Sequence, residues 1–155
     1  MNLDPQIQEL IDNAPQDGTT PALMQAIAPV IKAMAEKLKH PEYYVPRTVD
    51  GNWLMVTLKN RTKPAVEKHI ISAYPTLNDA AVGSQIMSNP TIDPLPIPVT
   101  HILFHMLAMK TVDSVIFFET PDNLQNGVEI FRNTLQEKIK THVQMLKQQG
   151  SSTIA

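Results

Sequence analysis

The sequence predicts an α+β fold: a mixed sheet of four to five strands with helices packed around it, preceded by two N-terminal helices. Apolar residues recur every three or four positions near the start of the chain, which is typical of amphipathic helices. Strand-forming residues cluster between 43 and 74, and a further apolar strand pattern at 112–119 lies between two helical patterns. Clustered strands with helices around them indicate the α+β class.

Two helices are predicted before residue 41. Asp4 and Thr20 are each followed by proline, a pattern of cap and first-turn proline that starts helices. We expect helices over 4–13 and 21–39, the second ending before Pro41, which pushes the preceding residue out of the α region. The apolar stripe of the second helix comprises Leu23, Ile27, Val30, Ile31, Met34 and Leu38.

A hairpin is predicted at the start of the β-rich region. Asp50-Gly51 lies between two strand-forming runs and is a typical hairpin turn. The run Trp53–Leu58 is almost wholly apolar, so we expect a strand that is buried on both faces. Trp53 is expected to pack in the core against the helix that starts near residue 21. The alternative is an aromatic anchor for a partner, because tryptophan is enriched in binding hot spots.

A third strand and a short helix follow. A polar connection is expected over 60–67 and a strand over 68–74. Thr76 can cap the next helix through its hydroxyl group.

The segment 88–98 contains four prolines and is predicted to be a stiff loop. Ile92, Leu95 and Ile97 give this loop apolar anchors, which we expect to be exposed. Long loops in compact domains are often functional, and prolines lower the ordering cost of binding. These three residues are therefore the predicted partner-binding surface.

The last third of the chain completes the predicted sheet. We expect a helix over 101–110, a buried strand over 112–119 and a further short strand over 127–131. Asn133 is expected to cap a final helix, and the polar tail from Gln148 is expected to fray.

The length suits a single domain over 1–155, with an N-terminal helical arm (1–40), an α+β core (41–147) and a tail (148–155). There are 13 basic and 15 acidic residues, giving a formal net charge of -2. Nucleic acid and anionic membranes reward a basic excess, so neither is an expected partner.

Several classes of site are excluded by composition. The chain has no cysteine, which removes disulfides, thiolate metal sites and cysteine nucleophiles. We expect no cofactor and no metal. The N-terminus lacks the basic and apolar regions of a signal peptide, and no apolar run approaches the roughly 18 residues of a membrane span. The sequence therefore predicts a soluble, cytoplasmic protein.

Short structural motifs between 43 and 147 share a pattern with one family. They are Tyr43-Tyr44-Val45-Pro46, Trp53-Leu54-Met55-Val56-Thr57-Leu58, Ile70 to Thr76 with Leu77-Asn78-Asp79-Ala80, Val99-Thr100-His101-Ile102-Leu103, Ser114 to Glu119 and Gly127-Val128-Glu129-Ile130. In these motifs the chain resembles the N-terminal domain of SseB-like (enhanced serine sensitivity) proteins. The chain departs from the family at Ala73-Tyr74-Pro75-Thr76 and Glu119-Thr120-Pro121. The resemblance implies an α+β fold and a non-enzymatic or uncharacterised module.

Two pairs involving histidine are candidate chemistry. His101 and His105 are four apart on a predicted helix, a spacing that can place two imidazoles on one metal, but no third ligand is evident. Glu67 and His69 are two apart on a predicted strand, so they can face the same side. Without a nucleophile nearby, we interpret them as a surface pair.

Charged clusters are also better explained by structure. Asp113 and Glu119 lie at opposite ends of one strand, roughly 20 Å apart, and cannot share a proton. Asp122 is expected to form a turn. Lys59, Arg61 and Lys63 make a basic cluster that we interpret as a solvated turn.

The sequence therefore predicts a non-enzymatic binding module that acts through a protein partner or through self-association. The alternative is a small-ligand-binding protein or enzyme in which His69, Tyr74 and Glu119 converge in a pocket. A homodimer formed through the helices of residues 1–40 is a third hypothesis.

Overall fold

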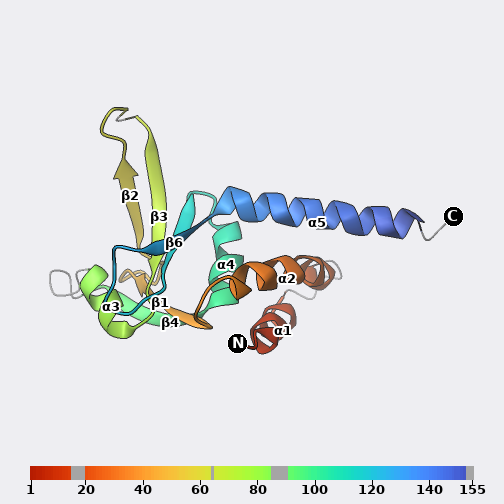
Figure 1. Ribbon diagram of the computed structural model, residues 1–155, viewed down its shortest axis with the longest axis horizontal. Helices are drawn as coiled ribbons and strands as arrows, with labels where there is room; N and C mark the ends of the chain where they lie inside the picture. The colour runs from red at the N-terminus through yellow and green to blue at the C-terminus, as the bar shows by residue number, and fades with distance from the viewer. Residues whose placement is uncertain (15–19, 64, 85–90, 153–155) are drawn as a thin grey trace.

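The computed structural model describes residues 1–14, 20–63, 65–84 and 91–152, and shows an α+β fold with two sheets (Figure 1). Predicted turn positions 15–19, Pro64 and Pro90 lie outside the described residues. No helix in the described ranges combines the length and apolar character needed to cross a membrane. The elements are α1 (Asp4–Asp12), α2 (Thr20–Glu36), β1 (Glu42–Arg47), β2 (Met55–Lys59), β3 (Glu67–Ala73), α3 (Leu77–Gly83), β4 (Asp93–Pro98), α4 (Val99–Ala108), β5 (Ser114–Phe118), β6 (Gly127–Phe131) and α5 (Arg132–Ser152).

The larger sheet is mixed, as predicted, but the strands form two sheets instead of one. Four strands lie in the order β2-β3-β5-β6, where β3 and β5 are parallel and the other pairs are antiparallel. The smaller sheet pairs β1 with β4. A bridge joins the two sheets: the Tyr44 N–H donates to the Tyr74 carbonyl at 2.7 Å, and the Tyr74 N–H donates to the Tyr44 carbonyl at 2.9 Å.

The core lies between the helices and one face of the four-stranded sheet. Leu3, which precedes α1, and Ile31 of α2 belong to the same buried cluster as Leu103 of α4 and Phe117 of β5. Because α1 and α2 bury their apolar faces in this cluster, a homodimer through these helices would have to use other side chains. Figure 1 shows α1, α2, α4 and α5 gathered on one side of the sheet, with α5 extending far beyond the body.

The predicted hairpin is wrong in its pairing, although its turn is present. Gly51 has φ of 83° and donates its N–H to the Thr48 carbonyl at 2.9 Å, which closes a tight turn. An isolated bridge between Arg47 and Trp53 follows. The chain then leaves β1, so that β2 pairs with β3 in the other sheet.

The expected burial of residues 53–58 is also wrong. All of β2 is exposed, because it is the edge strand of its sheet and extends beyond the packed helices. An apolar run can indicate burial, but it does not show which element of the fold, or which partner, covers the apolar side chains.

The segment 91–98 is not a loop: Asp93–Pro98 forms β4 against β1. Prolines fit in β4 because, among the described strands, it pairs with β1 alone; its other edge is open, and a missing N–H there costs no ladder bond.

The final helix also differs from prediction at both ends. It starts at Arg132, so Asn133 lies inside the helix instead of capping it. It continues through Ser152 instead of fraying from Gln148. Residues 153–155 lie outside the described part of the chain.

Candidate functional site

The β2–β3 arm, in its described residues 55–63 and 65–73, is the candidate site. Figure 1 shows this antiparallel pair projecting from the body, with β2 at its outer side. Met55, Val56 and Leu58 are large apolar residues in β2, and each has 39–46% of its surface exposed. Within the described residues, no strand pairs with the outer edge of β2. Such an edge presents backbone N–H and C=O groups that another strand can bind.

Thr57, in the middle of β2, directs its backbone toward this free edge. Its partner in the β2–β3 register is His69. The His69 N–H donates to the Asp113 carboxylate at 2.7 Å, and the Asp113 N–H donates to the His69 carbonyl at 2.8 Å. Both backbone groups of His69 therefore point toward β5, and the pair with Thr57 is of the type that exchanges no backbone hydrogen bonds.

The alternation along the ladder extends this assignment to the rest of β2. Three residues beyond Thr57, Asn60 donates its N–H to the Val66 carbonyl at 3.1 Å. Bonded and non-bonded pairs alternate along an antiparallel ladder. Met55, Thr57 and Lys59 therefore all turn their backbone groups to the free edge.

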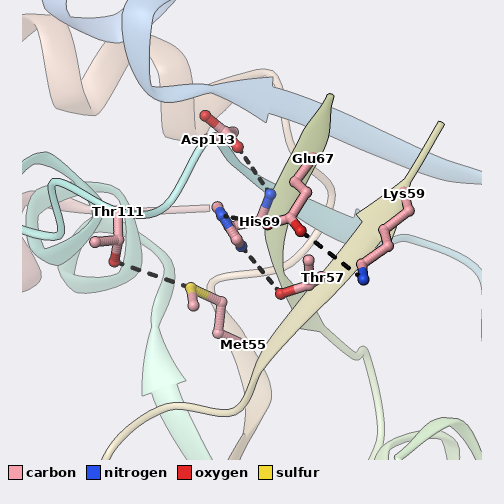
Figure 2. A network of polar contacts seen from close by, with 7 residues as sticks. All are labelled: Met55, Thr57, Lys59, Glu67, His69, Thr111 and Asp113. Atoms are coloured by element: carbon pink, nitrogen blue, oxygen red, sulfur yellow. Dashed lines mark hydrogen bonds and ion pairs between the residues drawn. The ribbon is translucent and has the colours of Figure 1, made fainter. Parts of the chain in front are cut away.

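Polar contacts hold the arm together on its core-facing side (Figure 2). The Thr57 hydroxyl lies 3.0 Å from His69 Nδ1, and the other ring nitrogen of His69 lies 3.8 Å from the Glu67 carboxylate. Glu67 in turn lies 4.0 Å from the Lys59 ammonium. The prediction that Glu67 and His69 face the same side is confirmed.

A hydroxyl, an imidazole and a carboxylate in this order are the residue types of nucleophilic triads. However, 3.8 Å exceeds hydrogen-bonding distance, so Glu67 does not orient the His69 ring as a triad acid would. The three side chains lie along an exposed arm. None of them lines either of the two hollows beside Trp53 that are described below. We interpret the group as a structural link between the two strands.

The opposite side of the arm is apolar where it meets the sheet. Val56 lies beside Ile70, and Leu58 lies beside Lys68. Ile70 is only 6% exposed although it is outside the main core cluster. Val56 and Leu58 thus extend a small apolar surface from the outer face of the sheet to its edge.

Lys68 and Glu129 form an ion pair next to this apolar surface. Their charged groups are 2.5 Å apart, and the Ser114 hydroxyl also donates to Glu129 at 2.5 Å. Burial would raise the pKa of Glu129, but the hydrogen bonds from Lys68 and Ser114 and the positive charge of Lys68 outweigh it, so that the pKa is lowered. The Lys68 ammonium also lies 5.0 Å from the centre of the Phe131 ring.

The tip of the arm carries the predicted basic cluster. Lys59, Arg61 and Lys63 are all exposed there. The Asn60 side chain accepts the Thr62 N–H at 2.9 Å, so a local side-chain turn shapes the loop. The prediction of a solvated turn is confirmed for these described residues.

Trp53 lies at the base of the arm, against α4 and not against α2 as predicted. Its ring meets the His105 ring edge-on, with centroids 5.5 Å apart. Burial, followed by the charge of His101, lowers the pKa of His105, which favours the neutral ring beside Trp53. An open hollow of about 480 Å³ lies on one side of Trp53, and another of about 300 Å³ lies on the His101 side.

The two histidines of α4 contact different neighbours: His105 meets Trp53, whereas His101 faces α1. His101 Nε2 lies 3.2 Å from the Gln6 carbonyl and 3.9 Å from the Glu9 carboxylate, so it links α4 to α1. In the described ranges, no group of three or more histidine, aspartate or glutamate residues could hold an ion.

His69, Tyr74 and Glu119 do not converge. His69 is near the start of β3, whereas Tyr74 follows its end, roughly 16 Å along an extended strand. Tyr74 stacks on Phe118 with ring centroids 5.1 Å apart. Its burial raises the pKa of its hydroxyl, an effect that a hydrogen bond with Ser72 opposes.

Glu119 has a structural role in connecting β5 to the end of α2. It accepts hydrogen bonds from the Tyr43 hydroxyl and, at 2.8 Å, from the Lys39 N–H. Burial and the contact with Glu119 raise the pKa of Tyr43, and a His40 ring nitrogen lies 2.7 Å from the Glu119 carbonyl. Asp122, with φ of 63°, forms a turn as predicted.

The predicted partner-binding residues lie in and beside β4, away from the arm. Ile92 is buried, with 8% of its surface exposed, which contradicts its expected exposure. Leu95 and Ile97 are half-buried, opposite Val45 and Tyr43 of β1. Their side chains are partly used by the small sheet, and a role in binding stays a prediction.

Sequence reasoning missed Thr57, Lys68 and Glu129 as functional candidates. The one available signal is that Thr57 is the single polar residue within the apolar run 53–58. Comparison with models of protein families and with curated proteins found no match. The resemblance to SseB-like proteins therefore stays a prediction.

Proposed function

We propose that this protein is a non-enzymatic binding module that takes up an extended protein segment along the free edge of β2. The observation that carries the proposal is the exposed, apolar β2, whose Met55, Thr57 and Lys59 direct their backbone groups outward. Backbone hydrogen bonds would supply affinity, and the alternating side chains would supply selectivity, as in other cases of strand addition.

The mismatch between composition and burial supports this proposal. Isolated edges of soluble proteins are commonly protected by proline, bulges or inward-pointing charges. In β2, Val56 and Leu58 point to the outer face, and the single charge, on Lys59, is at the end of the strand. A partner strand would cover these apolar side chains.

The test uses a fluorescein-labelled peptide of alternating valine and threonine, N-methylated along one edge so that it cannot pair with itself. Fluorescence anisotropy measures its binding to the full chain. Thr57→Pro removes an outward N–H without removing a bond to β3, and should weaken binding at least about tenfold, or 1.4 kcal/mol.

Thr57→Val is the matched control, because it keeps the backbone N–H and the side-chain shape but loses the hydroxyl contact with His69. It should bind the peptide as the unchanged chain does. Equal binding by Thr57→Pro, or no saturable binding at all, would contradict the proposal.

The SseB-like relationship and the cytoplasmic location belong to the same proposal. Both are compatible with a non-enzymatic module, and the shared motifs support the SseB-like relationship alone.

A further inference from the structure

We propose that the segment added to β2 is β2 of a second copy of this chain, so that two arms pair antiparallel about a two-fold axis at Thr57. This inference rests on the binding function proposed above and names its partner. It predicts one continuous sheet that crosses from one copy to the other.

The register follows from the direction of the backbone groups. In a two-fold interface, if residue i contacts residue j, then j also contacts i. The outward-facing residues of β2 are Met55, Thr57 and Lys59, and the middle of this set is Thr57. Pairing Thr57 with Thr57 of the second copy therefore also pairs each Met55 with a Lys59, and satisfies the outward groups of all three residues.

The side chains of β2 complement themselves in this register. Val56 opposes Leu58 of the second copy, and Leu58 opposes Val56, so two apolar cross-strand pairs form on the outer face. Apolar pairs of this kind contribute favourably to sheet stability. In this register odd-numbered residues of β2 oppose odd-numbered residues, and even-numbered oppose even-numbered. The outer faces of the two sheets therefore lie on the same side of the joined sheet.

The charges of the arm also favour the antiparallel arrangement. The basic tips, with Lys59, Arg61 and Lys63, lie at opposite ends of the paired arms. Lys59 meets Met55 instead of another lysine, whereas a parallel, in-register pair would place Lys59 beside Lys59. Directly opposed like charges destabilise a sheet.

The other edge of the sheet is a poorer candidate. Arg132 donates its N–H to the Asp113 carbonyl at 2.9 Å, so the alternation in β6 turns the backbone of Glu129 outward. A two-fold pairing centred there would oppose Glu129 with Glu129. In addition, α5 begins directly after β6 and limits the length of this edge.

The size of the interface sets the expected affinity. Five residues of β2 form a contact below the roughly 1,600 Å² of a standard interface. We therefore expect a weak dimer, with a dissociation constant on the order of 10 μM.

A cysteine series tests both the partner and the register, because the natural chain has no cysteine. Thr57→Cys would place two Cα atoms about 5.5 Å apart, within the range for a disulfide. Val56→Cys and Leu58→Cys would place the equivalent atoms on a diagonal, about 7–8 Å apart and beyond that range. Val82→Cys, exposed on α3, measures random collisions.

Under mild oxidation at about 50 μM protein, Thr57→Cys should form disulfide-linked dimers at least about tenfold faster than the other three variants. Faster linkage through Val56→Cys or Leu58→Cys would overturn the register. Linkage of all three β2 variants at the rate of Val82→Cys would overturn pairing between copies.

Light scattering of the unchanged chain, Thr57→Pro and Thr57→Val separates this inference from the proposed function. A mass that increases with concentration for the chain and Thr57→Val, but not for Thr57→Pro, supports the dimer. If every variant is monomeric while the peptide still binds through β2, the second copy is the wrong partner but the binding function stands. If neither dimer nor peptide complex forms, both proposals fail.

Discussion

The cap of α3 gives a prediction whose magnitude can be worked from the structure. Thr76 Oγ1 accepts the Asp79 N–H at 3.0 Å and donates to the Asp79 carboxylate at 2.7 Å. Asp79 is 3% exposed, and its other oxygen accepts the Asp122 N–H at 3.0 Å. One hydroxyl therefore supports both a helix start and a buried carboxylate, and Asp79 connects α3 to the turn after β5.

Thr76→Ala removes both functions of this hydroxyl. Loss of the cap costs about 1 kcal/mol. The buried Asp79 carboxylate also loses a hydrogen-bond donor, which costs about 1–2 kcal/mol more, the usual penalty for a buried polar group without its partner. We expect the free energy of unfolding to fall by about 2–3 kcal/mol, which for a chain of this length lowers the melting temperature by about 5–10 °C.

Urea unfolding followed by far-UV circular dichroism measures this change. Thr76→Ser is the matched control, because serine keeps the hydroxyl and is at least as good a cap. It should stay within about 0.5 kcal/mol of the unchanged chain. If Thr76→Ser loses as much stability as Thr76→Ala, or if Thr76→Ala loses less than about 0.5 kcal/mol, the hydroxyl does not have the role assigned to it.

Two further predictions concern the core and the outer face of the sheet. Leu103→Ala, at a fully buried position in α4, should lower the free energy of unfolding in urea by about 3–5 kcal/mol. Leu146→Ala, at an exposed position of α5, should lower it by less than about 0.5 kcal/mol, and equal losses would contradict the described core. Because the folded-state pKa of Glu129 lies below its ordinary value of 4.5, its stabilising contribution is present above that value and is lost as the pH falls through the lowered folded-state pKa. In acid titrations of urea unfolding, Glu129→Gln should be less stable at neutral pH and should show a smaller decrease below about pH 4.5, and an unchanged pH profile would contradict the assigned ion pair.

Local signals predicted most of the helices and turns. The Thr76 hydroxyl caps α3 as predicted, and Pro5 lies in the first turn of α1, because these effects depend on neighbouring residues alone. The predicted cap by Asp4 is wrong: Asp4 is the first helical residue, and the N-cap is Leu3, whose side chain makes no capping hydrogen bond. The Asp50-Gly51 turn was likewise readable from the ability of glycine to adopt positive φ.

Strand pairing could not be predicted in the same way. β1 pairs with β4, although about fifty residues separate them, and the prolines of β4 resemble those of a loop until the open edges of a two-stranded sheet are known. The exposure of β2 depends on where the helices pack, which its own sequence does not specify. The direction of the Thr57 backbone depends on contacts that His69 makes with Asp113, and these are visible only in three dimensions.

The shape of α5 affects how the size of this protein must be measured. Its 21 residues extend about 31 Å. The first part of α5 packs beside α2, and Figure 1 shows the C-terminal part continuing past α2 and away from the body. A single copy should therefore experience more hydrodynamic drag than a sphere of equal mass. On a gel-filtration column calibrated with spherical standards, it should elute early and resemble a heavier particle, whereas scattered light reports mass independently of shape.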